Sequence, residues 1–205
     1  ALFNNELLSS VALANMDADP ALEIVVTTAG SATTNARVFA LNNDTSIVPG
    51  WPQEVTKAIS IQQMMPAVAD IDADGLSEVV LANAEGKVYA WNNDGSLLWS
   101  QPMTDASTTQ VYTIPVPVLV DLDNDGLREV LVGMHSERWI WPNYVNVNQQ
   151  FIFKSDGTAS AGWPQTGMNA VVGDIDFDGK LEIISAYDWL SKMIAYELEG
   201  TKMPG

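Results

Sequence analysis

The chain has 205 residues, 47% of them hydrophobic, which is enough for one sizeable core or for an array of small repeats. Its 26 acidic residues outnumber 9 basic ones, and the formal net charge of −17 argues against binding to nucleic acid or to an anionic membrane surface. No apolar stretch reaches the roughly 18 residues of a membrane-spanning helix. Because the chain has no cysteine and a single histidine, any metal must be held by oxygen ligands or by His135.

A nine-residue acidic pattern occurs four times along the chain. Its copies begin at Asn15, Asp70, Asp121 and Asp174, between 51 and 55 residues apart, and they hold fifteen of the 26 acidic residues. The last three copies read Asp-x-Asp-x-Asp-Gly-x-x-Glu. Because clustered carboxylates repel one another unless a cation neutralises them, the acidity indicates local cation sites rather than a uniformly charged surface.

Each nonapeptide is followed by the same succession of short segments. A β-branched run comes first, at 24–27, 79–82, 130–133 and 183–186. An alternating run comes next, at 37–41, 87–91, 150–154 and 193–196. A turn signal follows at 43–45, 93–95, 155–157 and 199–201, and a tryptophan-containing closure lies near 49–52, 98–99 and 162–164. No segment shows a helical period.

A period of about 53 residues, with three clear strands and an expected fourth, is typical of propeller blades. We therefore predict an all-β fold in which residues 1–205 form a single β-propeller region of four-stranded antiparallel blades. The predicted repeats are approximately 1–53, 54–102, 103–165 and 166–205. The alternative fold is an ordinary β-sandwich.

The ends of the chain favour part of a larger propeller over a closed four-bladed ring. Residues 200–205 match 44–50, and the repeats are not staggered between the two termini. In that case apolar side chains would lie uncovered on the first and fourth blades, among them Val25, Phe39, Ile184 and Ile194. We expect further blades, from a longer chain or from an assembly, to cover them.

The complete nonapeptides have the composition of a calcium loop. Alternate side chains of a tight loop converge on one point, and glycine at the sixth position permits a positive φ. Three Asp, one Glu and the backbone carbonyl of the seventh residue would form an all-oxygen cage, which suits Ca²⁺. An EF-hand does not fit, because position twelve holds Leu81, Val132 and Ser185 instead of Glu. The alternative is an Asx-rich turn without metal.

The predicted ligands therefore fall into three full sets and one incomplete set. The full sets are Asp70, Asp72, Asp74, Leu76 and Glu78; Asp121, Asp123, Asp125, Leu127 and Glu129; and Asp174, Asp176, Asp178, Lys180 and Glu182. The incomplete set is Asn15, Asp17, Asp19, Ala21 and Glu23. Asn15 removes a charge and Pro20 replaces the glycine, so we expect this first site to be weak or empty.

The acidic motif, followed by the segment 86–95 (Gly-Lys-Val-Tyr-Ala-Trp-Asn-Asn-Asp-Gly) and a Gly-Trp-Pro closure, resembles the FG-GAP or VCBS repeat. That repeat occurs in the integrin α-subunit propeller and in many bacterial extracellular proteins. The resemblance implies a β-propeller with calcium in the loop between the first and second strands of each blade. The three complete loops of this sequence predict about three Ca²⁺ per chain. It also implies an extracellular or cell-surface setting, commonly with adhesion or glycan binding. Full Phe-Gly and Gly-Ala-Pro signatures are missing, so the chain is closer to the bacterial repeats.

The connections between second and third strands would lie on the rim opposite the calcium loops. There the third and fourth repeats carry aromatic residues, which we take as ligand candidates: Trp139, Trp141, Tyr144, Tyr187 and Trp189. Aromatic and amide side chains on one rim suit a glycan or a protein partner. The alternative is that the tryptophans fill gaps between blades.

Two classes of function are open. The first is a non-catalytic, calcium-stabilised extracellular binding or adhesion module that recognises a glycan or a protein. The second is the propeller of a calcium-dependent polysaccharide lyase, such as a rhamnogalacturonan lyase, or of another secreted enzyme. Among the residues of the candidate rim, His135, Glu137 and Asp188 could supply acid–base groups. Catalysis would require them to lie within about 4 Å of one another.

Overall fold

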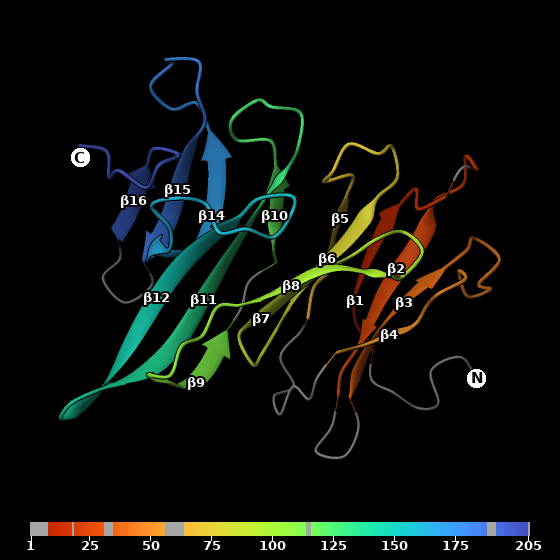
Figure 1. The fold of residues 1–205 in the computed structure, drawn as a ribbon, viewed down its shortest axis with the longest axis horizontal. Helices are drawn as coiled ribbons and strands as arrows, with labels where there is room; N and C mark the ends of the chain where they lie inside the picture. Colours follow the sequence, from red (N-terminus) through yellow and green to blue (C-terminus); the bar gives the residue numbers. More distant parts are fainter. Residues whose placement is uncertain are drawn as a thin grey trace.

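The computed structural model describes residues 8–17, 19–30, 35–55, 64–113, 116–187 and 192–204. These residues form four antiparallel sheets that follow one another in chain order (Figure 1). We call each sheet a blade. The first blade comprises β1 (Leu8–Ala14), β2 (Glu23–Thr28), β3 (Ala36–Leu41) and β4 (Gln53–Val55). The second comprises β5 (Ala67–Ala69), β6 (Glu78–Asn83), β7 (Lys87–Trp91) and β8 (Leu97–Pro102).

The third blade comprises β10 (Val118–Val120), β11 (Glu129–Ile140), β12 (Asn143–Phe153) and β13 (Gln165–Thr166), with β9 (Thr108–Thr113) as a fifth strand paired to β11. The fourth comprises β14 (Met168–Gly173), β15 (Glu182–Tyr187) and β16 (Lys192–Tyr196). The predicted all-β architecture of repeated antiparallel sheets is confirmed, because strands form where the sequence places the β-branched and alternating runs.

Each blade is a simple meander, since short polar turns join strands that are neighbours in sequence. In the turn after β7, the Asp94 carboxylate accepts a hydrogen bond from the Ser96 backbone N–H at 2.9 Å. Gly95, at the tip of the same turn, has φ of 79°. A similar Asx turn with a positive φ at Gly157 joins β12 to the residues that follow it. The turn chemistry read from the sequence therefore explains these hairpins.

Three apolar cores lie between successive blades. The core between the first and second blades contains fully buried Val25 and Val79, and the core between the second and third contains Ile71 and Val130. Ile183 belongs to the core between the third and fourth blades. The second and third sheets thus pack against a neighbouring blade on both faces, which explains why short strands carry so much apolar sequence.

A tryptophan from each closure fastens one blade to the next. The indole Nε1–H of Trp51 donates to the Asn93 carbonyl of the following blade's turn at 2.9 Å. Trp99 and Trp163 repeat this contact with the carbonyls of Ser155 and Leu198, both at 2.7 Å. The buried indole N–H groups are thereby satisfied, and each turn is fixed against its neighbour.

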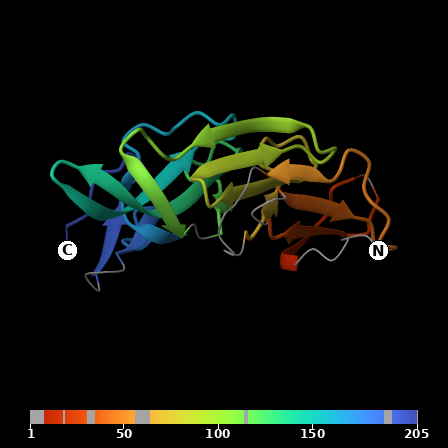
Figure 2. The same ribbon diagram turned by 90° about the horizontal axis from the view of Figure 1, so that it is seen from below.

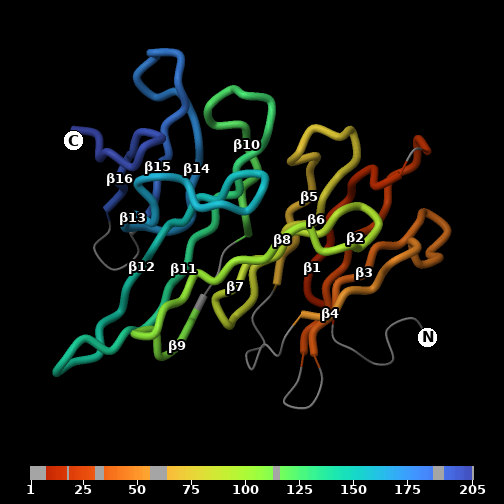
Figure 3. The backbone as a smooth tube through the Cα atoms, viewed as in Figure 1, coloured from red at the N-terminus to blue at the C-terminus, as the bar shows by residue number. Residues whose placement is uncertain are grey.

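The four blades form an open row. The first and fourth blades lie at its two ends in both views (Figures 1 and 2). The tube in Figure 3 shows the same progression from β1 to β16. The structure therefore does not show a closed four-bladed ring.

The prediction of which side chains lie on the uncovered end faces is partly wrong. Val25 is fully buried against the second blade, and Phe39 is buried on the outer face of its own sheet with the Arg37 guanidinium 4.8 Å from its ring centre. Ile194 packs toward the third blade. Because side chains alternate between the faces of a strand, an error of one residue in phase moves a side chain to the other face. Exposed apolar residues at the two ends include Leu13 and Met193.

The third blade is longer than the repeat predicts. Residues 135–146, which the repeat pattern places in the connection between the second and third strands, instead extend β11 and β12 into one long hairpin. The ladder continues without a register shift from the Val130–Phe153 pair to the Ile140–Asn143 pair. Strand β9 covers the outer edge of this extension.

Candidate metal sites and the opposite rim

The four acidic nonapeptides lie along one edge of the row. Each of them joins the first and second strands of a blade, at the top of the view in Figure 1. Each also brings carboxylate oxygens within 4.8 Å of one another. The groups are Asp17, Asp19 and Glu23; Asp70, Asp72 and Glu78; Asp121, Asp123 and Glu129; and Asp174, Asp176, Asp178 and Glu182.

A ladder of Asx hydrogen bonds shapes each complete loop. In the second blade, Asp70 Oδ2 accepts from the Gly75 N–H at 3.1 Å, and Asp74 Oδ1 accepts from the Leu76 N–H at 2.8 Å. Gly75 has φ of 93°, the left-handed conformation that the sequence predicts for position six. Position four is left-handed as well, with φ of 63° at Ala73, a feature that we did not predict.

The same contacts recur in the third and fourth loops. Gly126 donates to Asp121 at 2.9 Å and Gly179 donates to Asp174 at 3.1 Å. The fourth position is left-handed in both, at Asn124 and Phe177. The backbone carbonyls of Leu76, Leu127 and Lys180 stay predicted ligands.

The glutamate at position nine is hydrogen-bonded to the backbone N–H at position two of the same loop. Glu78 is fully buried, and its Oε2 accepts a hydrogen bond from the Ile71 backbone N–H at 2.8 Å. Glu129 makes the equivalent bond to Leu122, and Glu182 to Ile175. One carboxylate oxygen of each glutamate thus closes the loop while the other is left for a ligand.

Two of the loops contain buried carboxylate oxygens without any hydrogen-bond partner. They are Asp70 Oδ1 and Glu78 Oε1 in the second blade, and Asp174 Oδ1 and Glu182 Oε1 in the fourth. Burying an unpaired carboxylate oxygen is costly unless a cation binds it. A hard divalent cation among these oxygens would remove that cost, so the residues present fit Ca²⁺.

Burial and the neighbouring carboxylates also shift the pKa values of the loop glutamates. Burial raises the pKa of Glu78 from its ordinary value of 4.5 to about 7, and the charges of Asp72, Asp74 and Asp70 add to the rise. Burial likewise raises the pKa of Glu129, with Asp123 next to it contributing. Without a cation, these glutamates resist ionisation.

The first loop keeps part of this arrangement. Glu23 Oε2 accepts from the Met16 N–H at 2.7 Å, and Asp19 Oδ1 accepts from the Ala21 N–H at 2.6 Å. The position-one side chain, Asn15, instead donates from Nδ2 to the Asp19 carbonyl at 2.9 Å. The N–H that binds position one in the other loops is missing, because proline occupies position six. The weakness of this site stays a prediction.

Aromatic side chains gather on the opposite rim, at the tip of the long β11–β12 hairpin. Cross-strand pairing sets Trp139 opposite Tyr144, with ring centres 4.5 Å apart, and Trp141 lies 5.9 Å from Trp139. Trp141 is 82% exposed. These tryptophans therefore do not fill gaps between blades. Among the described residues, the tryptophans buried between blades include Trp51, Trp91, Trp99 and Trp163.

The same face of the hairpin continues with polar pairs. Below the Trp139–Tyr144 pair, the register places Glu137 opposite Asn146 and then His135 opposite Asn148. These pairs are two residues apart along each strand, so their side chains share one face. The hairpin thus carries a strip, which we call the aromatic–amide face, made of His135, Glu137, Trp139, Tyr144, Asn146 and Asn148.

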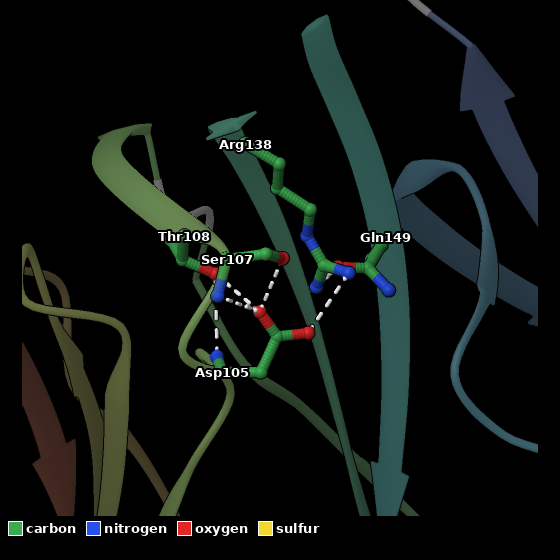
Figure 4. A network of polar contacts seen from close by, with 5 residues as sticks. All are labelled: Asp105, Ser107, Thr108, Arg138 and Gln149. Atoms are coloured by element: carbon green, nitrogen blue, oxygen red, sulfur yellow. Dashed lines mark hydrogen bonds and ion pairs between the residues drawn. The ribbon is translucent and has the colours of Figure 1, made fainter. Parts of the chain in front are cut away.

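A polar network holds this hairpin in place (Figure 4). The Arg138 guanidinium forms an ion pair with Asp105 at 3.0 Å and donates to Gln149 Oε1 on the neighbouring strand. Asp105 Oδ1 accepts from the backbone N–H and hydroxyl of Ser107, at 2.9 and 2.6 Å. These hydrogen bonds also lower the pKa of Asp105. The extension is therefore braced against the segment that leads into β9.

The predicted acid–base residues come together only in part. His135 Nδ1 lies 2.6 Å from Asn148 Oδ1, and Tyr112 stacks on the His135 ring with centres 5.1 Å apart. The Tyr112 hydroxyl donates to Glu137 Oε2 at 3.3 Å, so Tyr112 links the two predicted residues. Burial and the neighbouring Glu137 raise the pKa of Tyr112. Nothing in the sequence marks Tyr112, because it lies on the added strand β9.

The remaining predicted rim residues belong to the fourth repeat. Asp188 and Trp189 lie outside the described residues, and Tyr187 ends β15, where its backbone pairs with Lys192.

The described part of the chain also contains no helix of the length and hydrophobicity that a bilayer span requires.

Comparison with known proteins identifies the repeat. The family profile described as the FG-GAP-like repeat matches residues 70–132 and again 121–185. Two lambda-carrageenases, from Pseudoalteromonas sp and Pseudoalteromonas carrageenovora, are each 45% identical to this chain over 47 residues. That match covers 23% of this chain and 5% of each carrageenase.

A solved structure shares the fold. Rhamnogalacturonan lyase YesW superposes with a TM-score of 0.65 at 16% identity, over 96% of this chain and 42% of YesW. The chain therefore spans less than half of YesW and a small fraction of the carrageenases. At this identity the likeness to YesW concerns the fold.

Proposed function

Because the chain belongs to the FG-GAP-like repeat family, we propose that it is a calcium-stabilised, extracellular binding module that recognises a glycan. The observation that carries the proposal is the aromatic–amide face. It lies on the rim opposite the acidic loops, on a hairpin that a single ordinary blade does not need.

Calcium has a structural role in this proposal. Bound in the second, third and fourth loops, it neutralises the converging carboxylates and satisfies the buried oxygens of Asp70, Glu78, Asp174 and Glu182. The residues of each loop hold the ion between the first two strands of a blade. The ion therefore stiffens one edge of the row, and the binding hairpin projects from the other.

The chemistry of the hairpin suits a sugar. Sugars present apolar C–H faces, which stack on aromatic rings, and hydroxyl groups, which need both donors and acceptors. Trp139, Trp141 and Tyr144 supply the rings. Asn146 and Glu137 form the next pair on the same face, about 7 Å along the strands, and supply donors and acceptors there.

A glycan array with the calcium-loaded chain tests this proposal. The expected result is binding to a defined set of glycans that the double substitution Trp139→Ala and Trp141→Ala reduces at least tenfold. The matched control is Phe177→Ala, since Phe177 is 90% exposed on the calcium rim and the second loop already has Ala73 at that position. Equal binding by the hairpin variant, or binding to a protein ligand alone, would contradict a glycan-binding face.

A second candidate function is the propeller part of a polysaccharide-cleaving enzyme. The proximity of Tyr112, His135 and Glu137 favours it, together with the local likeness to lambda-carrageenases. The test is incubation with rhamnogalacturonan and with lambda-carrageenan, followed by measurement of new chain ends. Cleavage that His135→Ala and Glu137→Gln abolish would establish the enzyme, whereas binding without cleavage favours the module.

We also propose that a further blade covers the outer face of the fourth blade. Position two of the acidic loop is buried under the following blade in the first three copies, where Met16, Ile71 and Leu122 are 0%, 0% and 5% exposed. The equivalent Ile175 is 48% exposed, beside Met193 at 80%. The repeat pattern therefore favours a partner surface like the faces inside the row.

A further inference from the structure

One hydrogen-bonded contact joins two of the acidic loops directly. Arg128 is the eighth residue of the third loop, and its backbone N–H donates to the Ile71 carbonyl at 3.0 Å. Its guanidinium Nη1 donates to the Asp70 carbonyl. Both acceptors belong to the second loop, on the neighbouring blade.

The two peptide groups that Arg128 holds carry the anchor points of the second site. Asp70 supplies a buried carboxylate oxygen that has no partner. The Ile71 N–H donates to Glu78 Oε2 at 2.8 Å, and the Ile71 side chain is fully buried between the blades. Arg128 therefore fixes the backbone from which both buried carboxylates of this site are oriented.

Both bonds from Arg128 go to backbone carbonyls, not to carboxylates. The contact thus leaves the predicted metal-binding oxygens of Asp70 and Glu78 unobstructed. Arg128 itself is half-buried, directly before the buried Glu129 of its own loop. Arg128 is therefore one peptide bond away from a predicted ligand of the third loop.

The other loops have different residues at this position. Position eight is Leu22, Ser77 and Leu181 in the first, second and fourth loops. Between the first and second blades, the Met16 carbonyl accepts instead from Asn93 Nδ2, a turn residue, at 3.0 Å. Between the third and fourth blades, a cavity of about 460 Å³ lies beside Leu122 and Leu181.

We infer that Arg128 is a positioning residue that couples cation binding at the second loop to cation binding at the third. The inference rests on the proposed function, in which these loops bind calcium. When the third loop is ordered around its ion, Arg128 is held against residues 70–71, and Asp70 and Glu78 are held in place for the second ion. By reciprocity, an ordered second loop favours binding at the third by the same factor.

Simple electrostatics makes the opposite prediction. Arg128 is a cation close to two clusters of carboxylates, so its removal alone would strengthen binding of Ca²⁺ at both loops. In the coupling account, removal weakens the second site. The sign of the change therefore separates a positioning role from a role as a nearby charge.

Calorimetric titration of the chelator-treated full chain with CaCl₂ tests the inference. Arg128→Leu is the main variant, since leucine occupies this position in the first and fourth loops. The second site is identified as the one lost in Asp72→Ala. The expected result is an affinity at the second site reduced about fivefold or more, with the fourth site unchanged.

Asp123→Asn, which impairs the third loop, should weaken the second site by a similar factor. The double variant Arg128→Leu with Asp123→Asn should lose no more affinity at the second site than the single variant with the larger loss. Both substitutions interrupt the same coupling between the two loops, so their effects should not add. Lys192→Gln is the matched control, because it removes one positive charge from an exposed side chain at the start of β16 away from the loops and should leave all three affinities unchanged. If Arg128→Leu fails to fold, Arg128→Gln replaces it with the same expectations.

An unchanged or higher affinity at the second site in Arg128→Leu would overturn the coupling. Additive effects in the double variant would do the same, because they would show two independent perturbations. Three ions that bind independently would overturn this inference and leave the proposed function intact. A chain that binds no calcium at any loop would overturn both.

Discussion

Removal of calcium should destabilise the folded chain strongly. A chelator such as EGTA would leave the carboxylates of three complete loops converging without a counter-ion, including the orphaned oxygens of Asp70 and Glu78. A ligand that binds only the folded state stabilises it by about 2.7 kcal/mol per site at a hundredfold excess over Kd. Three such sites would contribute about 8 kcal/mol in total.

This loss is large enough to measure by thermal unfolding. For a chain of this size, 1 kcal/mol shifts the unfolding midpoint by about 2–4 °C. Circular dichroism in calcium and in EGTA should therefore give midpoints that differ by about 15–30 °C. The signal should return when calcium is added back.

Single-site variants divide the effect. Asp72→Ala should remove about one third of the calcium-dependent shift, since it disables one complete loop. Asp19→Ala should remove less, because Asn15 and Pro20 already weaken the first loop. The reasoning is refuted if EGTA leaves the unfolding curve unmoved, because the loops would then be turns that need no metal.

Three further predictions concern protons, blade contacts and the end of the row. In EGTA, the stability contributed by Glu78 should be greatest below pH 4.5 and fall as the pH rises to about 7, because its folded pKa lies above its unfolded value; Glu78→Gln should flatten this dependence in urea titrations. Trp163→Phe loses the bond to the Leu198 carbonyl and should cost about 1 kcal/mol in urea unfolding, and an unchanged midpoint would contradict the role of that contact. Light scattering should show self-association of the chain through its uncovered end, which Met193→Asp should reduce; a wild-type monomer would count against a partner blade.

The repeat could be predicted well from sequence because its signals are local. The spacing of Asp, Gly and Glu in each nonapeptide predicts a loop between two strands, and Gly75 takes the expected left-handed conformation. The turn around Asp94 and Gly95 forms as its residues predict. In these places the backbone geometry depends on side chains within a few positions.

The long hairpin of the third blade depends on contacts that no local pattern reveals. Strand β9 pairs with β11 across more than twenty residues, and the Arg138–Asp105 ion pair braces that pairing. The sequence of 135–146 therefore resembles a loop between two strands, although its residues continue the hydrogen-bonded pairing of β11 with β12. The contact between Tyr112 and Glu137 follows from the same pairing and could not be predicted either.

The local sequence does not determine which faces of the end blades are covered. The β2 strand is apolar on both faces, so alternation does not show which face is covered. Val25 faces the second blade and Val26 faces outward, a difference of one residue in phase. Pairing with β1 and packing on the next blade settle this phase, and both are tertiary contacts.

The calcium content of the purified chain tests the central claim most directly. After dialysis against buffered calcium and then against metal-free buffer, elemental analysis should give about three calcium ions per chain, one for each complete loop. Asp72→Ala should lower this number by one. A content of zero, or a transition metal in place of calcium, would contradict the account.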